Sequence, residues 1–492
     1  MLKNPDPVRL SAVVVSLLAM LVLVGCPAPP ADDPAVEEPV IEEPVVEEPA
    51  IEEPAIEEPA VETPAVETPA IETPAIETPA IETPAVETPA VETPAVETPA
   101  VETPAIEVPA IEPPAVETPA VETPAIEVPA IEPPAVETPA AVEPLAKAEL
   151  LVELDDAYST PDGMCLLPNG DVLLAVPNVN SWLAAVAEDA ENAKQDPPPM
   201  ILKITKDNKV EKYYDPPRHP VTGTAFPFGM CVDPEGKNLY ITDLQWFSNT
   251  EEPGNNSRVL RIPLDEDCNP AGEPVVLIEG MVVANAVIIR DGYLYVTDTS
   301  MVPKTNPDDP QISGILRVKL DAEGTKLTLP LLEDPHLVAT VKTFNPKVAF
   351  GADGLTFDSK GNLYCGNYAD GTLHKIEFDD EGNSKVEEAP IWAQDPTMKC
   401  CDGIFCDLRN DKIYVADSLA NAVQIVSPDG SVQCLAVDED NDGSGGRLDQ
   451  PCEVLIRGNE VIVSNMDFPT PGGVNKIWDK PYTISVIKLP AE

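Results

Sequence analysis

The fold of this chain is decided by one stretch of sequence, DGLTFDSKGNLYCGNY, which occupies residues 353–368. It opens with an Asp-Gly pair, continues with a short apolar run, turns through residues 358–362 and resumes with a second apolar run. Asp, Ser, Gly and Asn favour tight turns, whereas aromatic and branched apolar residues favour strands. The stretch therefore predicts two antiparallel strands joined by a short turn.

The same pattern occurs six times in residues 146–492. The opening residues of the copies are separated by 66, 57, 68, 49 and 51 residues, and they are Asp162, Phe228, Asn285, Asp353, Asp402 and Glu453. Further short apolar runs follow, such as 372–377 and 422–426, which gives about four strands per copy. Radial repetition of four-stranded sheets protects strand edges. The sequence therefore predicts an all-β fold, a six-bladed β-propeller.

The segments outside the repeats complete this expected ring. We expect residues 148–154 to add an outer strand to the last blade, and Ser181–Lys194 to form a short helix with Ser181 as its N-cap. Residues 300–313 and 468–482 are expected to form long loops over one face.

The repeats resemble the gluconolactonase/regucalcin group of six-bladed propellers, called the SGL family, and the related NHL-repeat propellers. The resemblance is carried by CDGI at 401–404 with KIYVAD at 412–417, and by GADGL at 351–355 with GNLY at 361–364. It spans residues 150–490. Because such repeats serve propellers of unlike function, the resemblance implies the fold more strongly than the activity.

Four of the six opening residues are carboxylates that can face the axial channel: Asp162, Asp353, Asp402 and Glu453. Converging carboxylates raise one another's pKa unless a cation neutralises them, and hard oxygen ligands suit Ca²⁺ or Mg²⁺. The other two opening residues are Phe228 and Asn285. The alternative is that these residues only make the turn that enters each strand.

The resemblance also implies roles for these residues. In gluconolactonase-like enzymes a divalent metal is held by a Glu of blade one, an Asn of blade four and an Asp of blade five. Asp162, Asp353 and Asp402 occupy those positions as expected metal ligands, although only Asp402 matches in identity. Asp402 or Glu453 is the expected general base, and Asn285 is expected to bind substrate. The expected cofactor is a divalent cation, calcium in the first place.

A second acidic segment fits the twelve-residue calcium-loop template. Its expected ligands are Asp438, Asp440, Asp442 and Asp449, with Gly443 at the sharp turn and Asp in place of the final Glu. The alternative is a solvated acidic loop. The Asp residues that end the second strands (Asp243, Asp298, Asp417 and Asp467) are expected to cap turns.

Nine cysteines follow Cys26, so at least one of them is unpaired if the others form disulfides. Cys401 and Cys452 each precede a channel residue in adjacent blades, which makes them a candidate pair. Cys165, Cys231 and Cys406 fall within apolar runs and are expected to be small core residues.

The first 145 residues predict export and a spacer. Leu10 to Val24 is a short apolar stretch after two basic residues, and LVGC at 23–26 resembles the lipobox of bacterial lipoproteins, with Cys26 as the lipidated residue. The alternative is an ordinary secretory signal. From Pro34 to Pro144 a proline stands at every fifth residue, which fits neither helix nor strand. We expect residues 1–26 to be a signal peptide and 27–145 a disordered acidic linker.

These features predict the cellular location and the partners of the protein. A lipidated chain would be anchored to the bacterial cell envelope, and the residue after the Cys, Pro27, favours the outer membrane, facing either the periplasm or the surface. The net charge of −56 makes nucleic acid a poor partner. Two functional classes remain for the propeller. It is either a metal-dependent hydrolase of lactones or related esters, or a non-catalytic propeller that binds a ligand or an envelope partner.

Overall fold

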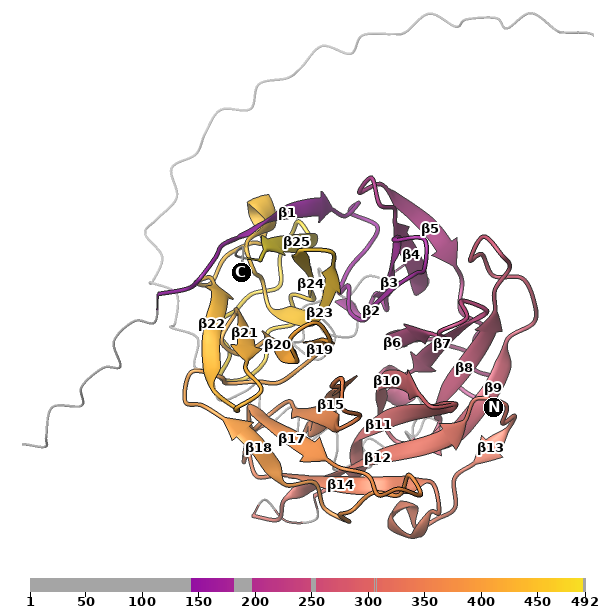
Figure 1. The fold of residues 1–492 in the computed structure, drawn as a ribbon. Helices are drawn as coiled ribbons and strands as arrows, with labels where there is room; N and C mark the ends of the chain where they lie inside the picture. Colours follow the sequence, from indigo (N-terminus) through magenta and orange to yellow (C-terminus); the bar gives the residue numbers. More distant parts are fainter. Residues whose placement is uncertain (1–142, 181–196, 249–253, 305, 307, 490–492) are drawn as a thin grey trace, which may run out of the picture. The chain divides into compact units, whose positions relative to one another are not determined.

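A computed structural model describes residues 143–180, 197–248, 254–304, 306 and 308–489. These residues form six β-sheets arranged around a central axis, with β2, β6, β10, β15, β19 and β23 innermost (Figure 1). The prediction of an all-β, six-bladed propeller is confirmed. The expected signal peptide with Cys26, most of the proline-rich tract and the expected helix at 181–194 lie outside the described residues.

The blades follow one another along the chain. Blade 1 contains β2 (Met164–Leu166), β3 (Val172–Val176), β4 (Met200–Ile204) and β5 (Val210–Tyr214). Blade 2 contains β6 (Pro227–Val232), β7 (Asn238–Asp243), β8 (Ser257–Pro263) and β9 (Val275–Met281). Blade 3 contains β10 (Ala284–Arg290), β11 (Tyr293–Val302), β12 (Gln311–Lys319) and β14 (Leu337–Thr343).

The remaining blades keep this order until the ring closes. Blade 4 contains β15 (Ala352–Phe357), β16 (Leu363–Asn367), β17 (Thr372–Ile376) and β18 (Ile391–Gln394). Blade 5 contains β19 (Ile404–Asp407), β20 (Lys412–Asp417), β21 (Ala422–Val426) and β22 (Val432–Val437). Blade 6 contains β23 (Pro451–Arg457), β24 (Glu460–Asn465), β25 (Thr483–Lys488) and β1 (Ala148–Glu153).

The ring closes between the two ends of the propeller sequence. β1 pairs antiparallel with β25, from Ala148 opposite Ile487 to Glu153 opposite Thr483. The expectation that residues 148–154 supply the outer strand of the last blade is therefore confirmed. This arrangement joins the beginning and the end of the propeller in one sheet.

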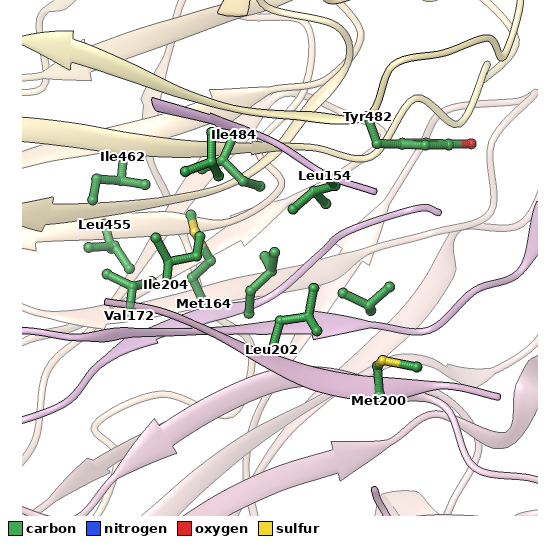
Figure 2. Packing of buried hydrophobic residues seen from close by; sticks show 13 residues of the cluster. Leu154, Met164, Val172, Met200, Leu202, Ile204, Leu455, Ile462, Tyr482 and Ile484 are labelled. Carbon is green, nitrogen blue, oxygen red and sulfur yellow. The ribbon is translucent and has the colours of Figure 1, made fainter. Parts of the chain in front are cut away.

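Each strand of a propeller blade has neighbours on both faces, which explains the unbroken apolar runs. In β3, Val172 and Leu174 pack toward blade 6, whereas Leu173 and Ala175 pack toward blade 2. Figure 2 shows the first of these contacts, in which Val172 and Ile204 of blade 1 lie near Leu455 and Ile462 of blade 6. Fully burying one such side chain is worth about 1.5–3 kcal/mol.

The repeated glycine fits the close approach of neighbouring blades. A Cβ on Gly354 would lie 2.4 Å from the carbonyl oxygen of Asp402, and a Cβ on Gly163 would lie 2.3 Å from that of Phe228. Real Cβ atoms essentially never come this close to another heavy atom. A side chain at the second residue of these copies would therefore require the backbone of the neighbouring blade to shift. The Asp-Gly motif is thus a packing signal between innermost strands as well as a turn signal.

Some connections differ from the expectation. Strands β11 and β12 extend into the segment expected to be a long loop at 300–313, because β11 continues through Val302 and β12 begins at Gln311. Residues 468–482 do form a loop. One strand was not expected: β13 (Thr325–Lys326) leaves the connection between β12 and β14 and pairs parallel with β9 of blade 2.

Short 3-10 helices are present at Gln245–Phe247 (η1), Leu331–Glu333 (η2) and Ser444–Gly446 (η3). Among the described residues, no helix has the length and apolar character needed to span a membrane.

Candidate functional site

The six opening residues are carried by the innermost segments of six different blades. Asp353 lies in β15 and Glu453 in β23, whereas Asp162 and Asp402 lie two residues before β2 and β19. Asp402 nevertheless continues the ladder with the second strand, because its N–H donates to the carbonyl of Ala416. Asp162 does the same with Ala175. The repeat therefore places one opening side chain per blade at the axis.

The four carboxyl groups at the axis interact with one another. Burial raises the pKa of Asp162 to about 7. Burial first, and then the charges of Asp162 and Glu453, hold the pKa of Asp353 well above its usual range. The pKa of Asp402 is raised well above its usual range by burial and by Asp353 and Asp162. The structure thus brings together the carboxylates that the sequence predicted to converge.

The pKa of Glu453 is also raised well above its usual range, by burial and by the charges of Asp162 and Asp402. Among the described residues, no Lys or Arg side chain lowers the pKa of any of these four carboxyl groups. A buried group of like charges without a basic partner is stabilised either by protons or by a bound cation. The donor set consists of carboxylate oxygens, which fits a hard divalent cation.

Hydrogen bonds orient these side chains. Asn285 Nδ2 donates to Asp353 Oδ1 at 2.9 Å, which links blade 3 to blade 4. Ser418 Oγ donates to Asp402 Oδ2 at 2.5 Å. The backbone N–H of Val454 donates to Glu453 Oε1 at 2.9 Å. At least one oxygen of each of these three carboxyl groups is therefore held by the protein.

The axial carboxylates interact, but no three of them place their ligand atoms within 4.8 Å of one another. Among the described residues, one set of at least three His, Cys, Asp or Glu side chains has its ligand atoms within 4.8 Å of one another. That set is Asp449, Asp467 and Asp479, and it does not include the axial carboxylates. An axial cation would therefore need inward rotation of these side chains or bound water to complete its coordination. Metal binding by Asp162, Asp353 and Asp402 stays a prediction.

An aromatic cluster lies beside this ring, made by Phe226, Phe228, Trp246, Phe247, Phe350 and Phe468. Phe228 occupies the blade-two opening position and stacks on Phe247, with ring centroids 5.5 Å apart. Trp246 contacts Phe350, and Phe247 contacts Phe468. These contacts join blades 2, 4 and 6, which are not neighbours in the ring. The cluster therefore connects non-adjacent blades across the ring.

The predicted calcium loop does not gather its four Asp residues around one point. Asp438 Oδ2 accepts the N–H of Leu448 at 2.9 Å, and Asp442 pairs with Arg447 at 2.8 Å. Asp440 accepts the N–H of Lys476 at 3.2 Å. Asp449 turns instead toward two residues outside the template, Asp467 and Asp479. In this structure the loop engages these side chains in backbone hydrogen bonds and an ion pair, and calcium binding by the four predicted ligands stays a prediction.

The second-strand Asp residues behave largely as expected. Asp243 accepts the N–H of Phe226, Asp298 accepts those of Val282 and Val283, and Asp417 accepts that of Lys399. Each thus holds the segment that leads into the innermost strand of its own blade. Asp467 differs, because it belongs to the acidic group with Asp449 and Asp479.

The expected pairing of Cys401 with Cys452 is wrong, since both thiols are free and buried. Cys401 packs in the cluster between blades 4 and 5, whereas Cys452 Sγ donates to Pro161 O on the side of blade 1. The two side chains point into different blade interfaces. Cys165 and Cys406 are buried core residues as predicted, and Cys231 is half-buried against the core.

Sequence reasoning missed a set of hydroxyl residues at the ends of second strands. They donate across blade interfaces to carbonyl oxygens of the next innermost segment: Thr242 to Asn285, Thr299 to Ala352, Ser418 to Pro451 and Ser464 to Asp162, at 2.7–2.8 Å. A Ser or Thr beside the strand-end Asp or Asn was the available signal. Ser418 also contacts Asp402 and thereby belongs to the axial site.

The architecture and the axial carboxylates define a six-bladed β-propeller with buried acidic side chains near its axis. The sequence matches no protein-family model and no curated protein. Solved structures similar to the chain include a gluconolactonase from Xanthomonas campestris, at 15% identity over 72% of this chain and 99% of that one, with a TM-score of 0.40.

Two further solved structures illustrate the same level of similarity. A putative gluconolactonase is 14% identical over 70% of this chain and 93% of its own, with a TM-score of 0.42. A PQQ-bound aldose sugar dehydrogenase from Streptomyces coelicolor is 15% identical over 71% and 99%, with a TM-score of 0.44. The structural neighbours thus include gluconolactonases, but also an enzyme of different chemistry.

Proposed function

We propose that this propeller is a divalent-metal-dependent hydrolase of lactones or related esters, with its active site in the axial channel. The observation that carries the proposal is the convergence of Asp162, Asp353, Asp402 and Glu453 from four blades, with no basic partner in the part of the chain that the structure describes. Hydrolysis of an ester carbonyl needs a cation or dipole for the oxyanion and a base for water, and this ring can supply both.

The expected ligands of the cation are Asp162, Asp353 and Asp402. A bound divalent cation would polarise the substrate carbonyl and stabilise the negative charge that develops on its oxygen. Its positive charge would also keep these carboxyl groups ionised despite their burial. Calcium fits this site best among divalent cations because the donors are all oxygens and are not pre-arranged in a tight octahedron.

The proton is moved by a carboxylate of the ring. Asp402 accepts a proton from the attacking water as the new C–O bond forms, and the same proton passes to the ring oxygen as the lactone C–O bond breaks. Ser418 Oγ donates to Asp402 Oδ2 and thereby orients the carboxyl group for this transfer. Glu453 is the alternative base, because one of its oxygens is held by Val454 in the same way.

Asn285 and the aromatic cluster would position the substrate. The Asn285 amide nitrogen is engaged with Asp353, so its oxygen is the atom that remains to accept a substrate hydroxyl. Trp246 and Phe350 of this cluster are partly exposed and can cover an apolar ring face. This combination favours cyclic esters over extended chains.

The test is turnover by the purified full-length chain on sugar lactones and aryl esters, with calcium, magnesium, manganese or zinc. Asp402→Asn should lower metal-dependent turnover by about 10²–10⁴-fold, the usual contribution of a general base. Asp429→Asn, which neutralises an acid bonded to Ser431 in the turn at 427–431, is the matched control and should keep full activity. Metal content must be measured in each variant, because Asp402 is also an expected ligand.

A second candidate is a non-catalytic propeller that binds a ligand or an envelope partner. It is favoured by the spacing of the axial carboxylates and by Phe228, which replaces a polar group in the ring. Metal bound at the axis without turnover on any substrate of the panel would support this second function. Turnover that is unchanged in Asp402→Asn would contradict the proposed mechanism.

A further inference from the structure

A second acidic group lies away from the axis, at the base of the loop 468–482. It consists of Asp449, Asp467 and Asp479, which offer one carboxylate oxygen each, all within 4.8 Å of one another. Asp449 stands two residues before β23, Asp467 stands two residues after β24, and Asp479 stands near the far end of the loop. Three separate parts of the chain thus bring a negative charge to one point.

Two oxygens of this group lack a hydrogen-bond partner. Asp449 is only 2% exposed, and its Oδ1 accepts Asn475 Nδ2 at 2.8 Å. Its Oδ2 accepts no hydrogen bond from a described residue, and it would lie 3.2 Å from a Cβ placed on Gly443. Asp479 Oδ1 is enclosed by protein and has no partner among the described residues. A buried carboxylate oxygen without a donor is costly unless a ligand occupies the position it faces.

The nearby basic side chains are engaged elsewhere. Lys476 Nζ donates to Gly473 O, Arg447 pairs with Asp442, and Lys480 pairs with Asp156. The donors that do reach the group are the amide of Asn475, which bonds Asp449 and Asp467, and the N–H of Asp479. Both donors are neutral, so they do not compensate three converging charges. Asp440 and Asp442 lie close enough to add to the negative potential.

We propose that Asp449, Asp467 and Asp479 form a calcium site that fixes the loop 468–482 to blade 6, separate from the axial channel. Oxygen ligands from irregular segments suit Ca²⁺, which takes six to eight oxygens in flexible geometry, whereas Mg²⁺ demands a near-ideal octahedron. Asp440, in the acidic segment 438–449, accepts the N–H of Lys476 with Oδ1 and is a candidate for a further ligand, and water would complete the coordination.

The site has a consequence for the aromatic cluster, because the same loop carries Phe468 and Thr470. Phe468 packs on Phe247 of the aromatic cluster, with centroids 6.4 Å apart. Thr470 Oγ1 accepts Gln450 Nε2 at 3.2 Å and lies 3.2 Å from the hydroxyl of Tyr368. Calcium at the base of the loop would therefore hold in place the residues that the loop presents beside the axial channel.

The experiment uses the full-length chain with calcium chloride as the only added metal, against the same protein in chelator. Trypsin cleavage after Lys476, a residue exposed in the loop, reports the order of the loop directly. Calcium should slow this cleavage at least tenfold in the wild type and in Asp402→Asn, but not in Asp479→Asn. The control Asp429→Asn should behave as the wild type.

Asp479→Asn removes a repelling charge, so its melting temperature in chelator should equal or exceed that of the wild type. Equilibrium dialysis with radioactive calcium provides the second readout. Asp402→Asn combined with Glu453→Gln should still bind one calcium ion, whereas Asp479→Asn should lose that ion and keep any axial one. Calcium protection of Lys476 that persists in Asp479→Asn, or a double axial variant that binds no calcium, would overturn the proposal whatever the activity of the protein.

Discussion

At the scale of single residues, the repeated glycine fixes how closely two blades approach. A Cβ on Gly403 would lie 2.3 Å from Glu453 Oε1 and 2.6 Å from the carbonyl oxygen of Cys452. The first contact is with an axial carboxylate and the second with rigid backbone. The residue that shapes the interface between blades 5 and 6 thus also sets the position of Glu453.

We therefore predict that Gly403→Ala destabilises the propeller by about 1–3 kcal/mol, as overpacking a well-packed core does. The control is Gly254→Ala, where the nearest atom would be the Asn256 side chain at 3.4 Å, an ordinary contact. Chemical denaturation of both variants measures the difference. Equal midpoints for the two variants would show that the blades can separate without cost at this position.

The axial residues could be predicted from sequence because each follows from its place in a repeat. The four carboxylates and Asn285 lie together as expected. Ser418 was not predicted, since its contact with Asp402 depends on the path of the chain after β20. Asp467 and Asp479 were not predicted as partners of Asp449, because they are 18 and 30 residues away in sequence and meet it only through the folded loop.

At the scale of elements, the ring depends on one strand that comes from the opposite end of the propeller sequence. β1 pairs along its length with β25 and contributes Val152 to the core between blades 6 and 1. Without β1, the edge of β25 would be exposed to solvent and open to pairing with another chain.

Deletion of residues 1–153 should therefore lower the melting temperature and promote association, whereas deletion of residues 1–142 should leave both unchanged. The two truncations differ chiefly in β1, because both remove the acidic tract through residue 142. Differential scanning calorimetry and light scattering are the measurements. A monomeric 154–492 domain with an unchanged melting temperature would contradict the role assigned to β1.

The presence of the blade strands was predictable because an apolar run bounded by turn residues forms a strand in every blade. The added strand β13 was not, since it is only two residues long and its partner belongs to the preceding blade. The lengths of β11 and β12 were also missed, because polar residues such as Thr299 and Ser313 are buried in cross-blade and strand contacts there.

At the scale of the whole molecule, buried acids dominate the electrostatics of the propeller. Burial raises the pKa of Asp298 and of Asp417 to about 6, and that of Asp467 to about 7. Burial and the neighbouring acids, Asp467 first, raise the pKa of Asp449 to about 9. The folded state thus retains protons that the unfolded chain, with ordinary Asp pKa values near 4, has already released.

Because the folded state binds more protons between about pH 4 and these raised pKa values, its free energy of unfolding falls as pH rises through that window. We predict that the melting temperature in chelator is higher at about pH 5 than at about pH 8. Calcium should stabilise more at the higher pH, where the carboxyl groups release their protons more easily to the metal. A melting temperature in chelator that rises from about pH 5 to pH 8 would contradict this assignment.

The N-terminal segment leads to a proposal about the cellular location of the protein. We propose that Cys26 is lipidated and anchors the chain to the cell envelope, on the basis of LVGC at 23–26 after a short apolar stretch. Radiolabelled palmitate should enter the wild type but not Cys26→Ser, and the variant should leave the membrane fraction or remain unprocessed. Equal labelling of both proteins would show that the lipid is attached elsewhere or that labelling is unspecific.

The most direct test of the account is anomalous diffraction from crystals of the protein grown with calcium. The account predicts a peak on the propeller axis, within about 2.3–2.6 Å of carboxylate oxygens of Asp162, Asp353 and Asp402. A peak beside Asp449, Asp467 and Asp479 would report the loop site independently. A well-ordered axial channel that holds only water at saturating calcium would contradict the central claim that the carboxylate ring is a metal centre.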